Sequence, residues 1–135
     1  MFRVSGKLFD VDRFLQLVRL KPSMVWRLEE TPYKGRPIES SGFSLVASGA
    51  AFDDVWQQID DVIAFLKHHE TDLALINTFP GVEEYLFDFG IEDRDVSHQA
   101  DYFPAELLRL AGNLNISLVI SRYPRTPDDA EIGEG

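Results

Sequence analysis

The segment AFDDVWQQIDDVIAFLKHHE, from Ala51 to Glu70, carries the strongest secondary-structure signal in this chain. Its apolar residues recur every three or four positions, which is the spacing of the stripe that an amphipathic helix buries. The stripe comprises Phe52, Val55, Trp56, Ile59, Val62, Ile63 and Leu66. We therefore predict one long helix, and we expect Trp56, in the middle of the stripe, to anchor the core.

The residues before this helix are predicted to form a strand, a helix and two more strands. Residues 2–8 alternate between apolar and polar, as in a half-buried strand. Residues 11–18 repeat at helical spacing after a capping position at Asp10, and Lys21-Pro22 ends the pattern. Residues 24–28 and 43–47 alternate again and should pair as a hairpin with a long loop.

The residues after the long helix are predicted to form strand, strand, helix and strand. Residues 72–79 are a short apolar run that suits a fourth strand, and residues 85–89 alternate as a fifth. Residues 103–112 read as a short helix ended by Gly112. The nearly continuous apolar run from Ile116 to Ile120 predicts an interior strand covered on both faces.

This order of elements predicts an α+β fold. Residues 2–78 follow the βαββαβ order of a ferredoxin-like split βαβ unit, and the remaining residues extend it by a further βαβ. We expect a two-layer structure with the helices on one face of the sheet. Residues 1–124 should form a single domain, and the acidic residues 125–135 a flexible tail.

Four segments of the chain resemble a family of small uncharacterised bacterial domains. They are SGKLFDVDRFLQL, LKPSMVW, GFSLVAS and FPAELLRLAGNLNISLVISRY. The family is the domain of unknown function numbered four-two-seven-nine, and the likeness spans about Phe2 to Tyr123. The resemblance implies a fold and no catalytic residues.

Composition narrows the classes of partner. The 135 residues include 23 Asp and Glu against 13 Lys and Arg, for a formal net charge of −10, and no cysteine. Such a chain lacks the clustered cations of a nucleic-acid binder and the thiolates of a zinc site. The N-terminus does not read as a signal peptide, and no apolar run approaches the roughly 20 residues that cross a bilayer. We therefore expect a cytoplasmic protein with no nucleic-acid or membrane partner.

Clusters of titratable residues do not form a recognisable catalytic or metal motif. On a helix, Asp61 and His68 would lie on the order of 10 Å apart, and the neighbouring His68 and His69 would diverge by about 100° unless the helix ended between them. The carboxylate pairs should face solvent, and Ser40-Ser41-Gly42 lacks the flanks of a nucleophile elbow. We therefore predict no catalytic residue, no metal and no cofactor; an enzyme whose residues converge only in three dimensions stays an alternative.

The loop YKGRP, Tyr33 to Pro37, is an island of positive charge. Tyr33, Lys34 and Arg36 could hold an anion beside the permissive backbone of Gly35. Proline and glycine are also ordinary residues of a hairpin connection, and no helix follows to supply amides for a phosphate. A turn is the favoured interpretation, and a small-ligand or anion sensor is the alternative.

The outer face of the long helix is the predicted partner surface. At about 100° per residue, Asp54 and Asp61 share one exposed ridge, Asp53 and Asp60 share another, and Phe65 projects beside the first. An aromatic anchor among acids suits a basic protein partner. We expect a non-enzymatic protein-binding domain, such as an immunity protein that neutralises a basic bacterial toxin; acidity that serves solubility alone is the simpler alternative.

Overall fold

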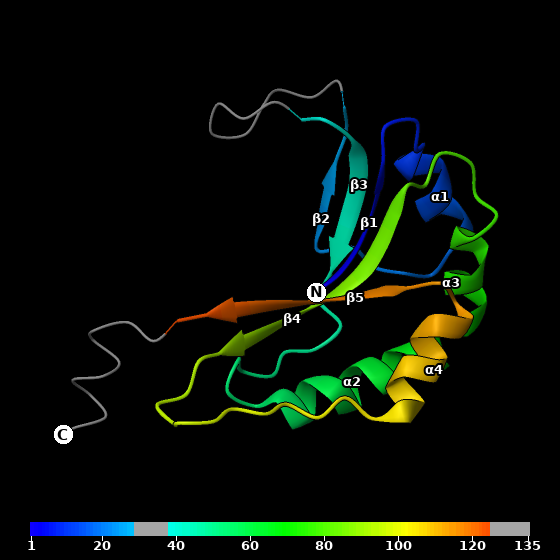
Figure 1. Ribbon diagram of the computed structural model, residues 1–135. Helices are drawn as coiled ribbons and strands as arrows, with labels where there is room; N and C mark the ends of the chain where they lie inside the picture. The colour runs from blue at the N-terminus through cyan, green and yellow to red at the C-terminus, as the bar shows by residue number, and fades with distance from the viewer. Residues whose placement is uncertain (29–37, 125–135) are drawn as a thin grey trace.

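The computed structural model describes residues 1–28 and 38–124, and these form five strands and four helices (Figure 1). In chain order they are β1 (Phe2–Gly6), α1 (Val11–Leu17), β2 (Met24–Trp26), β3 (Ser41–Leu45), α2 (Val55–His68), α3 (Glu70–Ile76), β4 (Glu84–Glu92), α4 (Ala105–Asn113) and β5 (Ser117–Tyr123). The predicted acidic tail lies outside the described residues.

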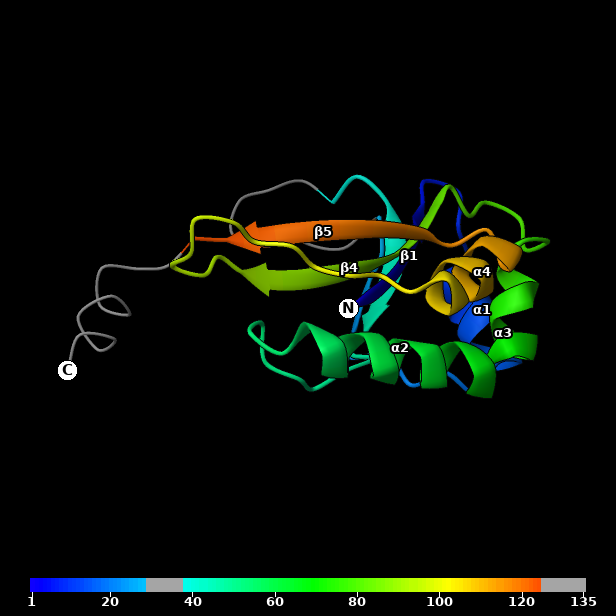
Figure 2. The same cartoon turned by 60° about the horizontal axis from the view of Figure 1, so that its bottom comes forward.

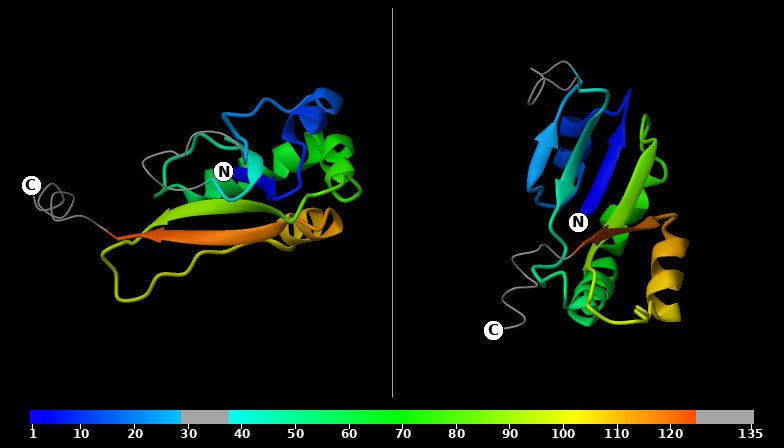
Figure 3. Two further views of the ribbon diagram at one scale, coloured as in Figure 1. Left: turned by 90° about the horizontal axis from the view of Figure 1, so that it is seen from above. Right: turned by 60° about the vertical axis from the view of Figure 1, so that its left-hand side comes forward.

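The five strands form one sheet in the order β2-β3-β1-β4-β5 (Figure 3). Every neighbouring pair from β2 to β4 is antiparallel, and β5 is parallel to β4. The order β2-β3-β1-β4 is that of a ferredoxin-like split βαβ unit, and α4 with β5 extends it by a further βαβ. The predicted α+β class and ferredoxin-like arrangement are confirmed.

The hydrophobic core lies between the sheet and the helices. The register places Phe2 of β1 beside Leu45 of β3 on one side and Phe87 of β4 on the other, so all three project to the same face. Phe2 and Phe87 are completely buried, with ring centroids 4.8 Å apart. Figure 2 shows α2 running beneath β4, on the face that these side chains cover.

The buried stripe of α2 is narrower than the sequence pattern suggested. Val55, Ile59, Val62 and Leu66 are buried, whereas Trp56 is 63% exposed. The prediction that Trp56 anchors the core is therefore wrong. Trp56 lies about 100° from Val55 around the helix, beyond the arc that faces the sheet. The opposite flank of the stripe is taken by a polar residue, Gln58, whose buried amide donates to the carbonyls of Ala51 and Gly90 at 3.1 and 2.9 Å.

Residues 72–79, predicted as a strand, begin within helix α3 instead. Short apolar runs fit a buried helix turn and a buried strand equally well, so the pattern alone does not separate them. The buried residues Leu73 and Ile76 are three apart, which is helical spacing. The fourth strand of the ferredoxin-like unit is consequently β4.

Strand β5 lies at the edge of the sheet, so the prediction of an interior strand is wrong. It pairs with β4 alone among the described strands, and Val119 and Ile120 are 37% and 51% exposed. Of its apolar residues, Leu118 packs against the core, and α4, to which β5 is joined, also contacts the strand. No helix within residues 1–28 and 38–124 is long and apolar enough to cross a membrane.

Candidate functional site

The acids predicted on the outer face of α2 differ in their surroundings. Asp53, Asp54 and Asp60 are exposed, as predicted, and the Asp54 carboxylate also caps the helix by accepting from the Gln57 amide at 3.2 Å. Asp61 is half-buried, and its carboxylate accepts from Ser48 Oγ at 2.6 Å and from Gln57 Nε2 at 2.8 Å. Asp61 therefore ties α2 to the segment after β3 and is not part of an open acidic ridge.

Phe65 does not project from the outer face of α2, which corrects the predicted exposure of this side chain. Its ring packs against the core, 5.8 Å from the ring of Phe2 and 5.7 Å from that of Phe87, measured between centroids. Phe65 lies half a turn around α2 from Trp56. This side of the helix also faces protein, because strands β1 and β4 lie beneath it. An aromatic anchor on the exposed face must come from other residues.

Two pairs of stacked aromatic rings occupy the N-terminal end of α2. Trp56 stacks on Tyr102, with centroids 6.0 Å apart and planes 27° from parallel. Phe52, just before the helix, stacks on Tyr123 at the end of β5, at 4.9 Å and 22°. These four rings are 46% to 66% exposed. The sequence pattern did not reveal the pairs, because their partners are 46 and 71 residues apart in the chain.

We call the exposed face around Trp56 and Tyr102 the aromatic-acidic surface. It comprises Asp53, Asp54, Trp56, Asp60 and Tyr102. The second ring pair is not part of it, because the register places Tyr123 beside Glu92, on the face of the sheet opposite the buried Phe89. Three of the five residues predicted to bind a partner, Asp53, Asp54 and Asp60, belong to it. The Trp56 and Tyr102 rings lie at the start of the helix among exposed carboxylates, which is the combination of apolar anchor and charge that the sequence had assigned to Phe65.

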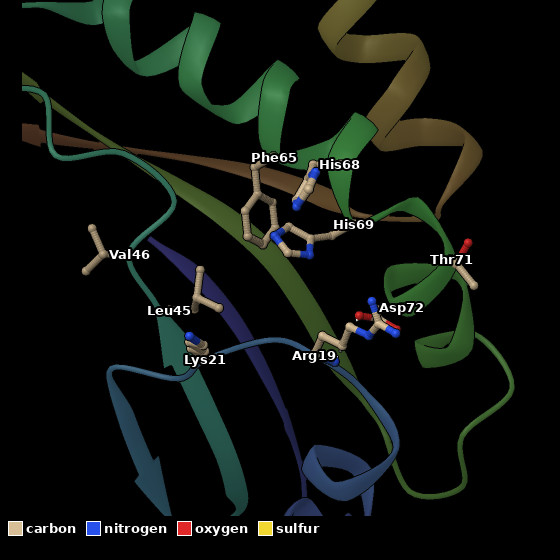
Figure 4. Close-up of a pocket in the computed structure, with 9 residues that line it drawn as sticks. All are labelled: Arg19, Lys21, Leu45, Val46, Phe65, His68, His69, Thr71 and Asp72. Atoms are coloured by element: carbon tan, nitrogen blue, oxygen red, sulfur yellow. Dashed lines mark hydrogen bonds between the residues drawn. The ribbon is translucent and has the colours of Figure 1, made fainter.

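A second site lies at the other end of α2. It is a cavity of about 780 Å³ between the end of β3, the segment after α1 and the junction of α2 with α3 (Figure 4). We call it the basic pocket. Its lining residues are Arg19, Lys21, Leu45, Val46, Phe65, His68, His69, Thr71 and Asp72.

The basic pocket brings cationic and imidazole side chains together from segments that are distant in the chain. In Figure 4 the His69 and Phe65 rings lie on one side of the opening, and Lys21 and Arg19 lie on the other. Asp72 Oδ2 accepts from the main-chain amide of Arg19 at 3.0 Å, which joins the segment after α1 to α3. This hydrogen bond sets the position of Arg19 at the edge of the pocket.

His68 and His69 converge because α2 ends between them. The helix stops at His68, α3 begins at Glu70, and the two imidazole centroids are 4.6 Å apart. Burial lowers the pKa of His69 below its ordinary value, and the neighbouring His68 lowers it further, while Asp72 partly opposes the shift. Within the described residues, no group of three or more His, Cys, Asp or Glu is arranged to hold a metal ion.

Sequence reasoning located a possible anion site elsewhere. The predicted residues Tyr33, Lys34 and Arg36 lie outside the described residues. The basic pocket was missed because its cations follow α1 and its imidazoles end α2, about 45 residues later, so no local motif joins them. The paired histidines were the one local signal, and helix geometry predicted that they would diverge unless the helix ended between them.

Comparison with known protein families identifies the chain. The model of a family described as "Domain of unknown function (DUF4279)" matches residues 1–125. The chain belongs to the DUF4279 family. DUF4279 membership confirms the resemblance seen in the sequence and covers the whole sheet, both candidate sites and all four helices. No match was found among curated proteins or among solved structures.

Proposed function

We propose that this DUF4279 chain is a non-enzymatic protein-binding domain that binds a basic protein through the aromatic-acidic surface. In its specific form, the proposal is an immunity protein that neutralises a basic bacterial toxin. The observation that carries it is the pair of stacked, half-exposed rings of Trp56 and Tyr102, next to exposed carboxylates at the start of α2. Exposed apolar patches rimmed by polar residues are typical of protein–protein interaction sites.

The stacked rings have the properties of binding anchors. Trp and Tyr are enriched among the residues that contribute most to interface energies, and they bring large contact areas with few rotatable bonds. Stacking holds Trp56 against Tyr102 before any partner arrives. Side chains already ordered lose less entropy on binding, which favours affinity.

The carboxylates beside the rings determine the kind of partner. Asp53, Asp54 and Asp60 are exposed, and the chain as a whole carries a formal net charge of −10. Such a field attracts cationic surfaces over about a Debye length and speeds encounter with them. A basic protein is therefore the partner that this surface favours over an acidic or neutral one.

Binding kinetics test the proposal. Immunity proteins are encoded beside their toxins, so the product of the adjacent gene is the first probe. We expect Trp56→Ala and Tyr102→Ala each to speed dissociation by roughly tenfold or more, as loss of an anchor of about 1.4 kcal/mol requires. Replacing Asp53, Asp54 and Asp60 with Asn should instead slow association and flatten its salt dependence.

Matched controls lie away from this surface. Met24→Ala removes an apolar side chain that is 63% exposed on β2, and Glu70→Gln removes an exposed charge at the start of α3. Both substitutions should leave the association and dissociation rates unchanged. If the variants of the aromatic-acidic surface fold and bind with wild-type rates, this surface is not the interface. If the adjacent product binds but keeps its toxic activity in the complex, the domain binds protein without being an immunity protein.

A further inference from the structure

The basic pocket concentrates positive charge in an acidic molecule. The guanidinium of Arg19 and the ammonium of Lys21 are charged at neutral pH, and among the described residues one carboxylate, that of Asp72, lines the pocket with them. Neither cationic group forms a hydrogen bond or an ion pair with residues 1–28 or 38–124. Two cations thus face one cavity without a protein partner in the described part of the chain.

The carboxylate of Asp72 is already engaged by the main chain. Its Oδ2 accepts from the Arg19 amide nitrogen at 3.0 Å, so it fixes the segment after α1 against α3. The guanidinium of Arg19 and the ammonium of Lys21 stay available to a ligand from solvent, because both side chains are exposed. The pocket also has an apolar lining: Phe65 and Leu45 both pack on the core.

We propose that the basic pocket binds a small organic phosphate monoester, with the phosphate at Arg19 and Lys21 and the organic body against Phe65 and Leu45. A phosphate dianion matches two cationic side chains, and a guanidinium offers paired N–H donors to its oxygens. The cavity, about 780 Å³, is within the range of small-molecule sites and is larger than inorganic phosphate alone requires. This site is separate from the aromatic-acidic surface and does not depend on the protein-binding role.

The His69 imidazole provides a direct report of occupancy. The groups that face His69 are His68 from α2, Asp72 from α3, and Arg19 and Lys21 from the segment after α1. The end of β3 and the residue after it contribute the apolar Leu45 and Val46. A dianion bound among them favours the charged form of the His69 imidazole, so the pKa of His69 should rise on binding. A ligand that bound elsewhere would leave the pKa of His69 unchanged.

The test uses the full chain and four commercial probes. Phenyl phosphate, inorganic phosphate, benzoate and benzyl alcohol are titrated at pH 7.5 and low ionic strength, with calorimetry for affinity and NMR for the histidine signals. We expect phenyl phosphate to bind most tightly, inorganic phosphate and benzoate each at least about tenfold more weakly, and benzyl alcohol not measurably. Benzoate or inorganic phosphate binding as tightly as phenyl phosphate would overturn the assignment.

Paired variants separate the pocket from general charge. Arg19→Gln with Lys21→Gln should weaken phenyl phosphate binding by at least about tenfold and abolish the rise in the pKa of His69. Arg19→Gln retains the main-chain amide that donates to Asp72, so the fold is expected to persist. Far-UV circular dichroism verifies this. Lys7→Gln with Arg13→Gln removes two exposed cations outside the pocket and should change neither readout. An equal loss of phenyl phosphate binding in both double variants would refute the proposal. So would the absence of binding by the wild-type chain at millimolar phenyl phosphate.

Discussion

Burial of an aromatic side chain depends on the direction in which it leaves its helix or strand. Phe87 leaves β4 toward the helices, is completely buried, and packs on Phe2 and Phe65. Trp56 leaves α2 toward the segment that precedes α4, and it is 63% exposed against Tyr102. Trp56 has the larger ring but therefore contributes less to the core than Phe87 does. The Trp56 ring is free to contribute to binding.

This contrast predicts unequal effects on stability. Phe87→Ala should lower the free energy of unfolding by about 3–5 kcal/mol, because it leaves a cavity in the core. Trp56→Ala should lower it by about 1 kcal/mol or less, the value of an exposed stacked pair. Urea denaturation of the two variants measures both. A loss of about 3 kcal/mol or more for Trp56→Ala would show that the ring is buried in solution.

Helix α2 begins and ends at residues that also belong to the candidate sites. Asp54 caps its N-terminus by accepting from the Gln57 amide, and it lies on the aromatic-acidic surface. His68 and His69 lie at its C-terminus, where the negative end of the dipole favours cationic side chains, and they line the basic pocket. The helix therefore orients an acidic group at one end and imidazoles at the other.

The contribution of the Asp54 capping hydrogen bond to stability can be measured separately from that of the Asp54 charge. Asp54→Ala removes the acceptor of the Gln57 amide and should cost about 1 kcal/mol of stability, whereas Asp54→Asn retains an equally good cap and should change stability little. Asp53→Ala, an exposed acid without a capping bond to this helix, is the control. Thermal unfolding distinguishes them. A cost for Asn equal to that for Ala would mean that the charge of Asp54, and not the hydrogen bond, stabilises α2.

The two candidate sites lie toward opposite ends of α2. From Trp56 to His68 the helix rises roughly 18 Å, and the aromatic-acidic surface and the basic pocket share no side chain. Substitutions in one should act independently of substitutions in the other, since sites beyond about 10 Å usually show additive effects. A partner protein and a small anion could therefore occupy the molecule together.

The sheet and the helices are joined by close approaches between turns that are distant in sequence. Gly81, before β4, has φ +87°, and a Cβ on it would lie 2.3 Å from the carbonyl oxygen of Leu8 in the turn after β1. The carbonyl oxygen of Gly81 occupies the space that a Cβ on Gly6 would need. Only a residue without a side chain permits both approaches.

This close approach predicts opposite outcomes for two glycine substitutions. Gly81→Ala should cost about 2–4 kcal/mol, from left-handed strain together with the overlap at Leu8. Gly112→Ala, in α4 with open space around it, should raise stability by about 0.5–1 kcal/mol. Chemical denaturation of both variants provides the comparison. A near-neutral Gly81→Ala would contradict the packing of these two turns.

The α+β class and the long helix followed from the sequence alone, because both rest on local periodicity. Alternation in β1 and β3, and the repeat of Val55, Ile59, Val62 and Leu66, reflect burial on one face, which a chain records residue by residue. The acids Asp53, Asp54 and Asp60 were placed correctly on the exposed face for the same reason. Family membership was also readable from these segments.

Tertiary structure decided what local periodicity does not encode. Whether residues 72–79 form helix or strand, and whether β5 is central or at the edge, depends on which elements pack beside them, and the sequence predictions there were wrong. The exposure of Trp56 and the burial of Phe65 depend on how far the strands extend under α2. The stacked ring pairs and the basic pocket likewise join residues brought close only by the fold, because contacts between distant segments leave no spacing in the chain from which to predict them.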